Sequence, residues 1–325
     1  MKVTVAVAQM DDQGLTNLNF MDKFHPISPV IHTDILARLQ EIERVHDVTV
    51  LYACESGSRG WGFASPDSDY DVRFIYVHRL PWYLQVSTAR DVIEEPINGD
   101  LDINGWELRK ALGLMKKGNA TLIEWLDSPV VYRADPIFLE QMRTAARQTH
   151  QANRTFHHYI HMARGNYREY LRGETVRLKK YLYVLRPLLA TLWVEQGRGV
   201  APIRFSALVE ALIAEPELRQ AIDELLAHKR TASEAQYGKP WPVINQFIDN
   251  ELTRLESVSP PAYALMDFTV LDSLLMGVVL ENSGVHTVIN SRRSPFEHSA
   301  AVSAEAESLR SDQHSTSNRR AAVAK

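Results

Sequence analysis

The chain has 325 residues, of which 45% are hydrophobic and 23% charged, a composition typical of globular proteins and a length sufficient for two domains. Its net charge of −4 excludes attraction to nucleic acid through overall charge, so a polyanion would need a local basic patch. The single cysteine excludes an internal disulfide framework, and no apolar run approaches the roughly 20 residues of a membrane span, so we expect a cytoplasmic protein without a membrane partner.

The first predicted element follows an N-terminal extension, residues 1–27. Apolar residues then recur at helical spacing, at Ile31, Ile35, Leu39 and Ile42. This periodicity predicts an amphipathic helix over residues 33–45.

Strand signals follow this helix. Residues 48–57 are rich in β-branched and aromatic residues and end in glycine, which predicts a strand that enters a turn. Residues 71–77 are almost continuously apolar, which predicts a central strand. Residues 89–97 and 99–105 suggest two further short strands, with a turn between them.

Helix signals return after these strands. Asn104 and Glu107 have the spacing of a capping box, so a helix is expected to follow and to end near Gly118. Residues 121–126 predict another helical segment, which ends before Pro129.

The order of elements predicts an α+β protein. Residues 28–150 are expected to form a small mixed α/β domain, and residues 151–283 show helical periodicity with few strand signals. The leucines of the second segment are assigned to its core: Leu182, Leu185, Leu188, Leu189 and Leu192. Residues 284–325 are polar and poor in aromatic residues, which predicts a disordered tail.

Two aspartates mark the start of the predicted central strand. Asp69 and Asp71 are two residues apart, so their side chains point to the same face if the strand begins at or before Asp69. Paired carboxylates can hold one or two Mg²⁺ ions, which activate a hydroxyl and stabilise a leaving pyrophosphate. The alternative is a turn with solvated acids, which the neighbouring sequence makes less favourable.

A small, flexible pair precedes these acids. Ten residues separate Gly57-Ser58 from Asp69. Gly57 allows the backbone to approach a phosphate, the Ser58 hydroxyl can donate to it, and the Arg59 guanidinium can clamp it.

A two-metal site normally needs a third carboxylate. Asp102 is the first choice, because it lies on a predicted strand just before a helix. Asp100, on the same face, is the second choice, and Glu94 is the third.

Residues 57–77, "GSRGWGFASPDSDYDVRFIYV", resemble the signature of the DNA polymerase β-like nucleotidyltransferase superfamily. Residues 100–132 and 179–190 are similar to its RlaP branch, which is associated with RNA repair. The resemblance covers about residues 28–280. It implies a nucleotidyltransferase palm, a small mixed sheet with flanking helices, followed by a helical domain. It further implies that Gly57 and Ser58 contact a triphosphate and that Asp69, Asp71 and Asp102 are catalytic acids that bind metal.

Charged residues within the leucine-rich helix need a partner, because burial of an unpaired charge is costly. Lys180, Tyr183 and Arg186 are therefore predicted nucleotide-binding residues, although acidic side chains of the first domain are an equally suitable partner. A second basic set shares one helix face: His157, His161, Arg164 and Arg168. It is either an ordinary solvated face, which is the favoured interpretation, or a stripe that meets a triphosphate or an RNA backbone.

The predicted activity is transfer of a nucleoside monophosphate from an NTP, such as ATP, to an acceptor hydroxyl with release of pyrophosphate. The expected cofactor is Mg²⁺, with two ions during turnover and Mn²⁺ as a substitute. The acceptor is an RNA end, a small alcohol or a protein side chain, and the sequence does not determine the oligomeric state. The alternative is a nucleotide-binding regulatory or antitoxin-like protein with little or no catalytic activity.

Overall fold

The computed structural model describes residues 26–87, 89–231 and 237–285. The chain divides into two units, Met1–Gly284 and Val285–Lys325, and the fold below is that of the first. The predicted N-terminal extension and the predicted tail lie outside the described residues, apart from 26–27 and 284–285.

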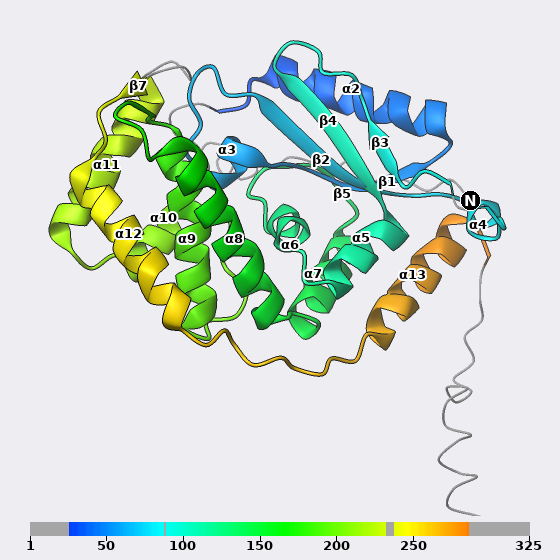
Figure 1. Cartoon of the computed structure of the whole chain (residues 1–325). Helices are drawn as coiled ribbons and strands as arrows, with labels where there is room; N and C mark the ends of the chain where they lie inside the picture. The colour runs from blue at the N-terminus through cyan, green and yellow to red at the C-terminus, as the bar shows by residue number, and fades with distance from the viewer. Residues whose placement is uncertain (1–25, 88, 232–236, 286–325) are drawn as a thin grey trace, which may run out of the picture. The chain divides into compact units, whose positions relative to one another are not determined.

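A five-stranded mixed sheet is formed by the first half of this unit (Figure 1). Its strands are β1 (Thr49–Glu55), β2 (Tyr70–Val77), β3 (Val92–Glu94), β4 (Leu101–Glu107) and β5 (Val131–Ala134). Their spatial order is β3-β4-β2-β1-β5, in which β2 and β4 pair in parallel and the other neighbours are antiparallel. The predicted mixed sheet and the central position of residues 71–77 are confirmed.

Helices cover both faces of this sheet. They are α2 (Pro29–His46), α3 (Gly57–Trp61), α4 (Leu80–Tyr83), α5 (Leu108–Lys116), α6 (Ala120–Leu126) and α7 (Pro136–Gln148). α2 packs on one face, where Leu39 lies in a cluster with Val72 and Phe74. α5, α6 and α7 pack on the other face around Ile75. Because alternate strand residues point to opposite faces, Asp71 shares the second face with Ile75.

The predicted capping box at Asn104 and Glu107 is wrong in part. Asn104 lies within β4, which pairs with β2 as far as Glu107. Glu107 itself is the N-cap of α5, and its side chain accepts hydrogen bonds from the backbone N–H groups of Arg109 and Lys110. Pairing with a central strand extends β4 through residues whose local pattern favours a helix start.

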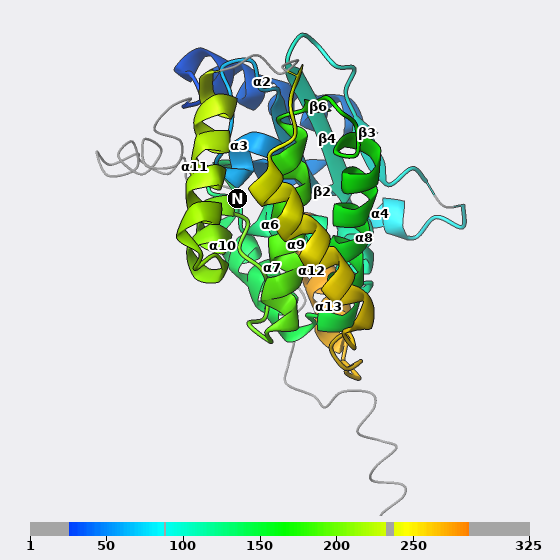
Figure 2. The same ribbon diagram turned by 60° about the vertical axis from the view of Figure 1, so that its left-hand side comes forward.

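The second half of the unit is helical, as predicted. It contains α8 (Ala152–Tyr170), α9 (Lys180–Glu195), α10 (Phe205–Leu212), α11 (Pro216–Thr231) and α12 (Pro242–Ser257), with a two-stranded sheet of β6 (Val176–Arg177) and β7 (Tyr237–Gly238). α9 contacts α8, α10 and α12, as Figures 1 and 2 show. All five predicted core leucines on α9 are buried. No helix among the described residues is long and apolar enough to span a membrane.

The last described helix, α13 (Thr269–Asn282), packs against the first half of the unit. It contacts α4, α5, α7 and β2, and Leu271 and Val279 join the hydrophobic cluster of the sheet (Figure 1). The sequence grouped this segment with the helical residues 151–283. The position of the boundary between the two predicted domains stays a prediction.

Cys54 gives a direct test of the packing under β1. Its thiol is fully buried in the cluster with Ile75, and burial raises its pKa to about 12. We expect the native protein to resist a disulfide reagent such as DTNB at pH 8, because the reagent cannot reach the buried thiol and the thiol is not ionised at this pH. After unfolding in guanidinium chloride, one equivalent should react; rapid reaction of the native protein would contradict this packing.

Candidate active site

The acids predicted from two separate segments meet at the parallel pair of strands. Asp71 of β2 lies opposite Asp102 of β4 in the register of this pair. Their side chains are 28% and 34% exposed, so solvent and a ligand can reach both. Asp102 is the acid opposite Asp71 in this register, whereas Glu94 lies on β3 and pairs with Arg90.

An arginine joins the two carboxylates. The Nη2 atom of Arg73, two residues after Asp71 on β2, donates to Asp71 Oδ1 at 3.0 Å and to Asp102 Oδ2 at 2.7 Å. Its Nη1 atom also donates to the Asp102 carbonyl oxygen at 3.1 Å. The guanidinium thus neutralises charge between two acids that would otherwise repel each other. Arg73 was not among the residues predicted from the sequence, although its position two residues from Asp71 signals that the two share a face.

Gly57 lies directly against Asp71. A Cβ atom on Gly57 would lie 1.9 Å from Asp71 Oδ2, so a larger residue would clash with Asp71. The φ of Gly57 is +56°, in the left-handed region, which also disfavours any residue other than glycine. The preceding Ser56 N–H donates to the Asp71 carbonyl oxygen at 2.9 Å. Ser58 follows in the first turn of α3 and is buried. The predicted Gly-Ser pair and Asp71 are therefore neighbours in space.

Arg59 supports the loop that carries Asp69. It is buried, and its guanidinium donates to the backbone carbonyl oxygens of Ser68 at 2.8 Å and Asp69 at 3.2 Å. It also lies 4.1 Å from the centroid of the Tyr70 ring. These contacts fix the backbone just before β2, whereas the sequence predicted a phosphate clamp. The Asp69 side chain is exposed next to the start of β2.

A buried glutamate lies beneath the site. Glu55, the last residue of β1, is fully buried and accepts hydrogen bonds from the Asp71 backbone N–H at 2.8 Å and from the Tyr132 hydroxyl. Burial raises the pKa of its carboxyl to about 8, although the two donors act in the opposite direction. Glu55 was missed because an acid at the end of an apolar strand usually signals exposure.

Arg186 pairs with a carboxylate of the first half of the unit. It is 1% exposed, and its Nη1 donates to Glu124 Oε1 of α6 at 2.7 Å. Burial alone would lower the pKa of the guanidinium, but Glu124 and Tyr159 raise it above its ordinary value. Glu124 also accepts from the Tyr159 hydroxyl at 2.8 Å and from Trp61 Nε1 at 3.3 Å. The sequence allowed either a substrate phosphate or an acidic side chain as the partner of Arg186, and the structure shows the acidic side chain, Glu124.

Tyr183 and Lys180 lie beside the loop that carries the glycine. The Tyr183 ring meets the ring of Trp61, the last residue of α3, edge-on at 5.5 Å. Lys180 Nζ lies 5.0 Å from the centroid of Tyr183 and 4.1 Å from that of Tyr170. Tyr183 therefore contacts α3 directly, at Trp61, and Lys180 lies next to Tyr183.

Lys229 is a further basic residue at this loop. It comes from the end of α11 and is buried, and its Nζ atom donates to Ser65 Oγ at 2.6 Å. Ser68 Oγ lies 3.4 Å from the same atom. Both serines belong to the loop that leads to Asp69. More than 150 residues separate Lys229 from this loop, so no sequence pattern could have linked them.

The acid pair fits a divalent cation. The part of the chain that the structure describes contains no cluster of three or more His, Cys, Asp or Glu side chains placed to hold a metal ion. Mg²⁺ usually needs only one or two protein carboxylates, because water and substrate phosphates complete its shell. The half-exposed carboxylates of Asp71 and Asp102 meet that requirement, with Asp69 exposed nearby.

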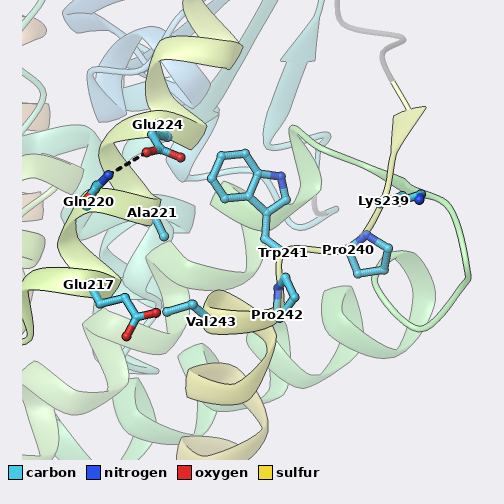
Figure 3. A pocket seen from close by; sticks show the side chains of 9 residues that line it. All are labelled: Glu217, Gln220, Ala221, Glu224, Lys239, Pro240, Trp241, Pro242 and Val243. Atoms are coloured by element: carbon cyan, nitrogen blue, oxygen red, sulfur yellow. Dashed lines mark hydrogen bonds between the residues drawn. The ribbon is translucent and has the colours of Figure 1, made fainter.

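A groove on the helical half lies apart from these residues. It has a volume of about 590 Å³ and is shown in Figure 3. It is lined by Glu217, Gln220, Ala221, Glu224, Lys239, Pro240, Trp241, Pro242 and Val243. No residue of the predicted site lines it, so it is not part of the candidate active site.

Residues 31–277 match the family described as "RlaP: RNA repair pathway DNA polymerase beta family". The chain belongs to this family. The RlaP match includes the acids, the glycine loop and both α8 and α9, which confirms the resemblance stated for the signature of residues 57–77.

Two other similarities were found. The RlaP-family chain is 48% identical over 221 residues to a Bacillus subtilis (strain 168) protein named "Uncharacterized protein YcgL", and this covers 68% of the chain and 85% of that protein. A crystal structure of a nucleotidyltransferase-like protein from Exiguobacterium sibiricum 255-15 is 14% identical, with a TM-score of 0.27 and coverage of 82% and 81% of the two chains.

Proposed function

We propose that this RlaP-family protein transfers a nucleoside monophosphate from an NTP to a hydroxyl at an RNA end, with release of pyrophosphate. The observation that carries the proposal is the parallel register that sets Asp71 opposite Asp102, with Gly57 against Asp71. The family description, which names an RNA repair pathway, supports RNA as the acceptor.

In the proposed reaction, Asp69, Asp71 and Asp102 would hold Mg²⁺. Bound Mg²⁺ would supply Lewis-acid activation of the hydroxyl and charge neutralisation at the phosphates. Gly57 has no Cβ atom, which allows the Asp71 carboxylate to lie directly against it, and Arg59 fixes the loop before Asp69. The acceptor oxygen bonds to the α-phosphorus, the bond from that phosphorus to the pyrophosphate oxygen breaks, and the hydroxyl proton passes to the carboxylate of Asp71 or Asp102.

The test is direct transfer of label. The purified protein is incubated with Mg²⁺, each of the four NTPs labelled at the α-phosphate, and RNA strands with free 3′ hydroxyls. We expect labelled RNA and one pyrophosphate per transfer, both abolished by EDTA. Transfer of label to small alcohols or proteins, but not to RNA, would contradict the proposal that RNA is the acceptor. Binding of NTP without transfer of label to any acceptor would contradict the proposal that the protein catalyses nucleotidyl transfer.

The second candidate is the regulatory protein that binds nucleotide without turnover. The contact of Arg73 with both Asp71 and Asp102 favours it, because a guanidinium between two acids opposes the entry of a metal ion. Binding of NTP with no label transfer is the result that this candidate expects.

Arg73 permits a prediction that does not depend on catalysis. Replacement of Arg73 by methionine should tighten Mn²⁺ binding about fivefold, because the ion would no longer compete with an ion pair worth about 1 kcal/mol. Isothermal titration calorimetry measures the change, and thermal melting should show a less stable metal-free protein with a larger gain on adding Mn²⁺. Arg73→Lys is the control that keeps the charge. Unchanged or weaker Mn²⁺ binding in Arg73→Met would show that Arg73 does not compete with the metal.

A further inference from the structure

The exposed side of α8 carries a row of basic side chains. Arg154, His157, His161 and Arg168 follow one another at i, i+3, i+7 and i+14, which places them along one helix face. All four are exposed, whereas Tyr159 on the opposite side is buried. We refer to these four residues as the α8 basic face.

The α8 basic face lacks acidic partners within the described residues. None of its four side chains forms an ion pair there, and the only acid in α8 is Glu169. Surface arginines on other helices do pair with carboxylates: Arg38, Arg44, Arg147 and Arg254. Arg164, at the border of the face, is half-buried and lies 3.9 Å from Glu256. In a chain with an excess of acids, an exposed basic row without carboxylates favours an anionic ligand.

The row is long and begins beside further cations. Arg154 and Arg168 are 14 residues apart, which corresponds to about 21 Å along the helix. At its first end, Arg154 packs against Gly118 and donates to the Lys117 carbonyl oxygen at 3.4 Å. Lys116 and Lys117 are both exposed there. A single triphosphate is too short to contact the whole row.

The C-terminal half of α8 contacts elements next to the candidate active site. Asn166 Nδ2 donates to the Tyr183 carbonyl oxygen at 3.0 Å, and the Tyr183 ring contacts Trp61 of α3. Lys180 lies over the ring of Tyr170, the last residue of α8. α3 begins at Gly57, which touches Asp71. Asn166 and Tyr170 lie on the same side of α8 as Tyr159, so the helix contacts these elements through the side opposite its basic face.

We propose that the α8 basic face binds the phosphate backbone of the RNA strand whose end accepts the nucleotide. A linear series of phosphates matches a linear row of basic groups, and contacts to phosphate position a strand without selecting its sequence. The inference rests on the proposed function, because it assigns the acceptor strand of that reaction to a surface. This proposal replaces the interpretation of these basic side chains as an ordinary solvated helix face.

Binding is measured without turnover. Fluorescence anisotropy of a labelled single-stranded RNA is recorded with the full chain in EDTA and no NTP, over a range of salt concentrations. The variant Arg154→Gln/Arg168→Gln should bind about tenfold or more weakly at 0.1 M salt, and the slope of log K against log salt should fall by about 1.4, or about 0.7 per lost phosphate contact. Adding His157→Gln and His161→Gln should weaken binding further.

The matched control is Arg38→Gln/Arg44→Gln, which removes two charges from α2 and should leave RNA affinity unchanged. Circular dichroism melting confirms that both double variants are folded. Equal RNA binding by the α8 variant and wild type, or equal losses in the control, would overturn the proposal. So would tighter binding of a DNA strand of the same sequence or of phosphatidylserine vesicles. Label transfer by a wild type that binds no RNA would remove this inference and leave nucleotidyl transfer standing.

Discussion

Replacement of Asp71 or Asp102 by asparagine is expected to slow nucleotidyl transfer by roughly 10³-fold or more, since a metal ion supplies several kcal/mol of transition-state stabilisation and each 1.4 kcal/mol is a factor of ten. The two residues face each other across β2 and β4, so each asparagine removes half of the charge that this pair offers to Mg²⁺. Single-turnover label transfer with saturating NTP measures the loss.

Two neighbouring acids provide the controls for this experiment. Glu94→Gln should keep near wild-type activity, because Glu94 is an exposed residue of β3 paired with Arg90. Asp100→Asn tests the second choice for the third acid. Its side chain is exposed and precedes β4, and its carbonyl oxygen, which the substitution keeps, accepts from the Tyr70 N–H at 2.7 Å. Loss of activity in Asp100→Asn with full activity in Asp102→Asn would show that Asp100, and not Asp102, is the third acid.

Replacement of Arg186 by alanine is expected to lower the free energy of unfolding by about 3–5 kcal/mol, because it leaves Glu124 buried without its cation. The pair is 2.7 Å apart, and among the residues that the structure describes Glu124 would keep hydrogen bonds only from the neutral donors Tyr159 and Trp61. Denaturant titration at pH 7 measures the change.

A double variant separates the ion pair from the packing. Glu124→Gln/Arg186→Met keeps most of the volume and removes both charges, and it should recover at least half of the loss, since replacing a buried pair is often close to neutral. A loss below 1 kcal/mol in Arg186→Ala, or a double variant as unstable as that single one, would show that the pair is not what stabilises this region.

This pair also changes how nucleotide binding should be tested on α9. Loss of NTP binding in Arg186→Ala would be ambiguous, because the substitution removes support from Glu124 and Trp61 as well. Lys180→Ala is the cleaner variant. Lys180 is half-buried, and its ammonium group lies over the rings of Tyr170 and Tyr183.

Local patterns in the sequence were sufficient to predict most of the elements around the site. The helix of α2 and the strand of β2 follow from periodicity and from β-branched and aromatic content. The predicted helix over 33–45 became Pro29–His46, because Ser28 caps it and Pro29 is suited to its first turn. Residues 57–77, which contain Gly57-Ser58 and Asp69-x-Asp71, resembled the signature of the nucleotidyltransferase superfamily, and residues 100–132 and 179–190 resembled its RlaP branch.

Local patterns failed where pairing between distant segments decided the outcome. The Asn104–Glu107 spacing is typical of a helix start, but hydrogen bonding to β2 keeps these residues in a strand up to Glu107. The helical periodicity of residues 269–282 was correct, but periodicity does not say which surface a helix covers, and α13 packs on the sheet.

The sequence by itself determined the types of residue available to this protein: a Gly-Ser pair, acids two residues apart, and a leucine-rich helix that contains charges. Only the tertiary structure decided their partners. The parallel register placed Asp102 opposite Asp71 and within reach of Arg73, and the packing of α9 on α6 gave Arg186 to Glu124. The physical reason is that strand register and helix packing depend on burying apolar faces of segments far apart in the chain, which no local pattern of residues encodes.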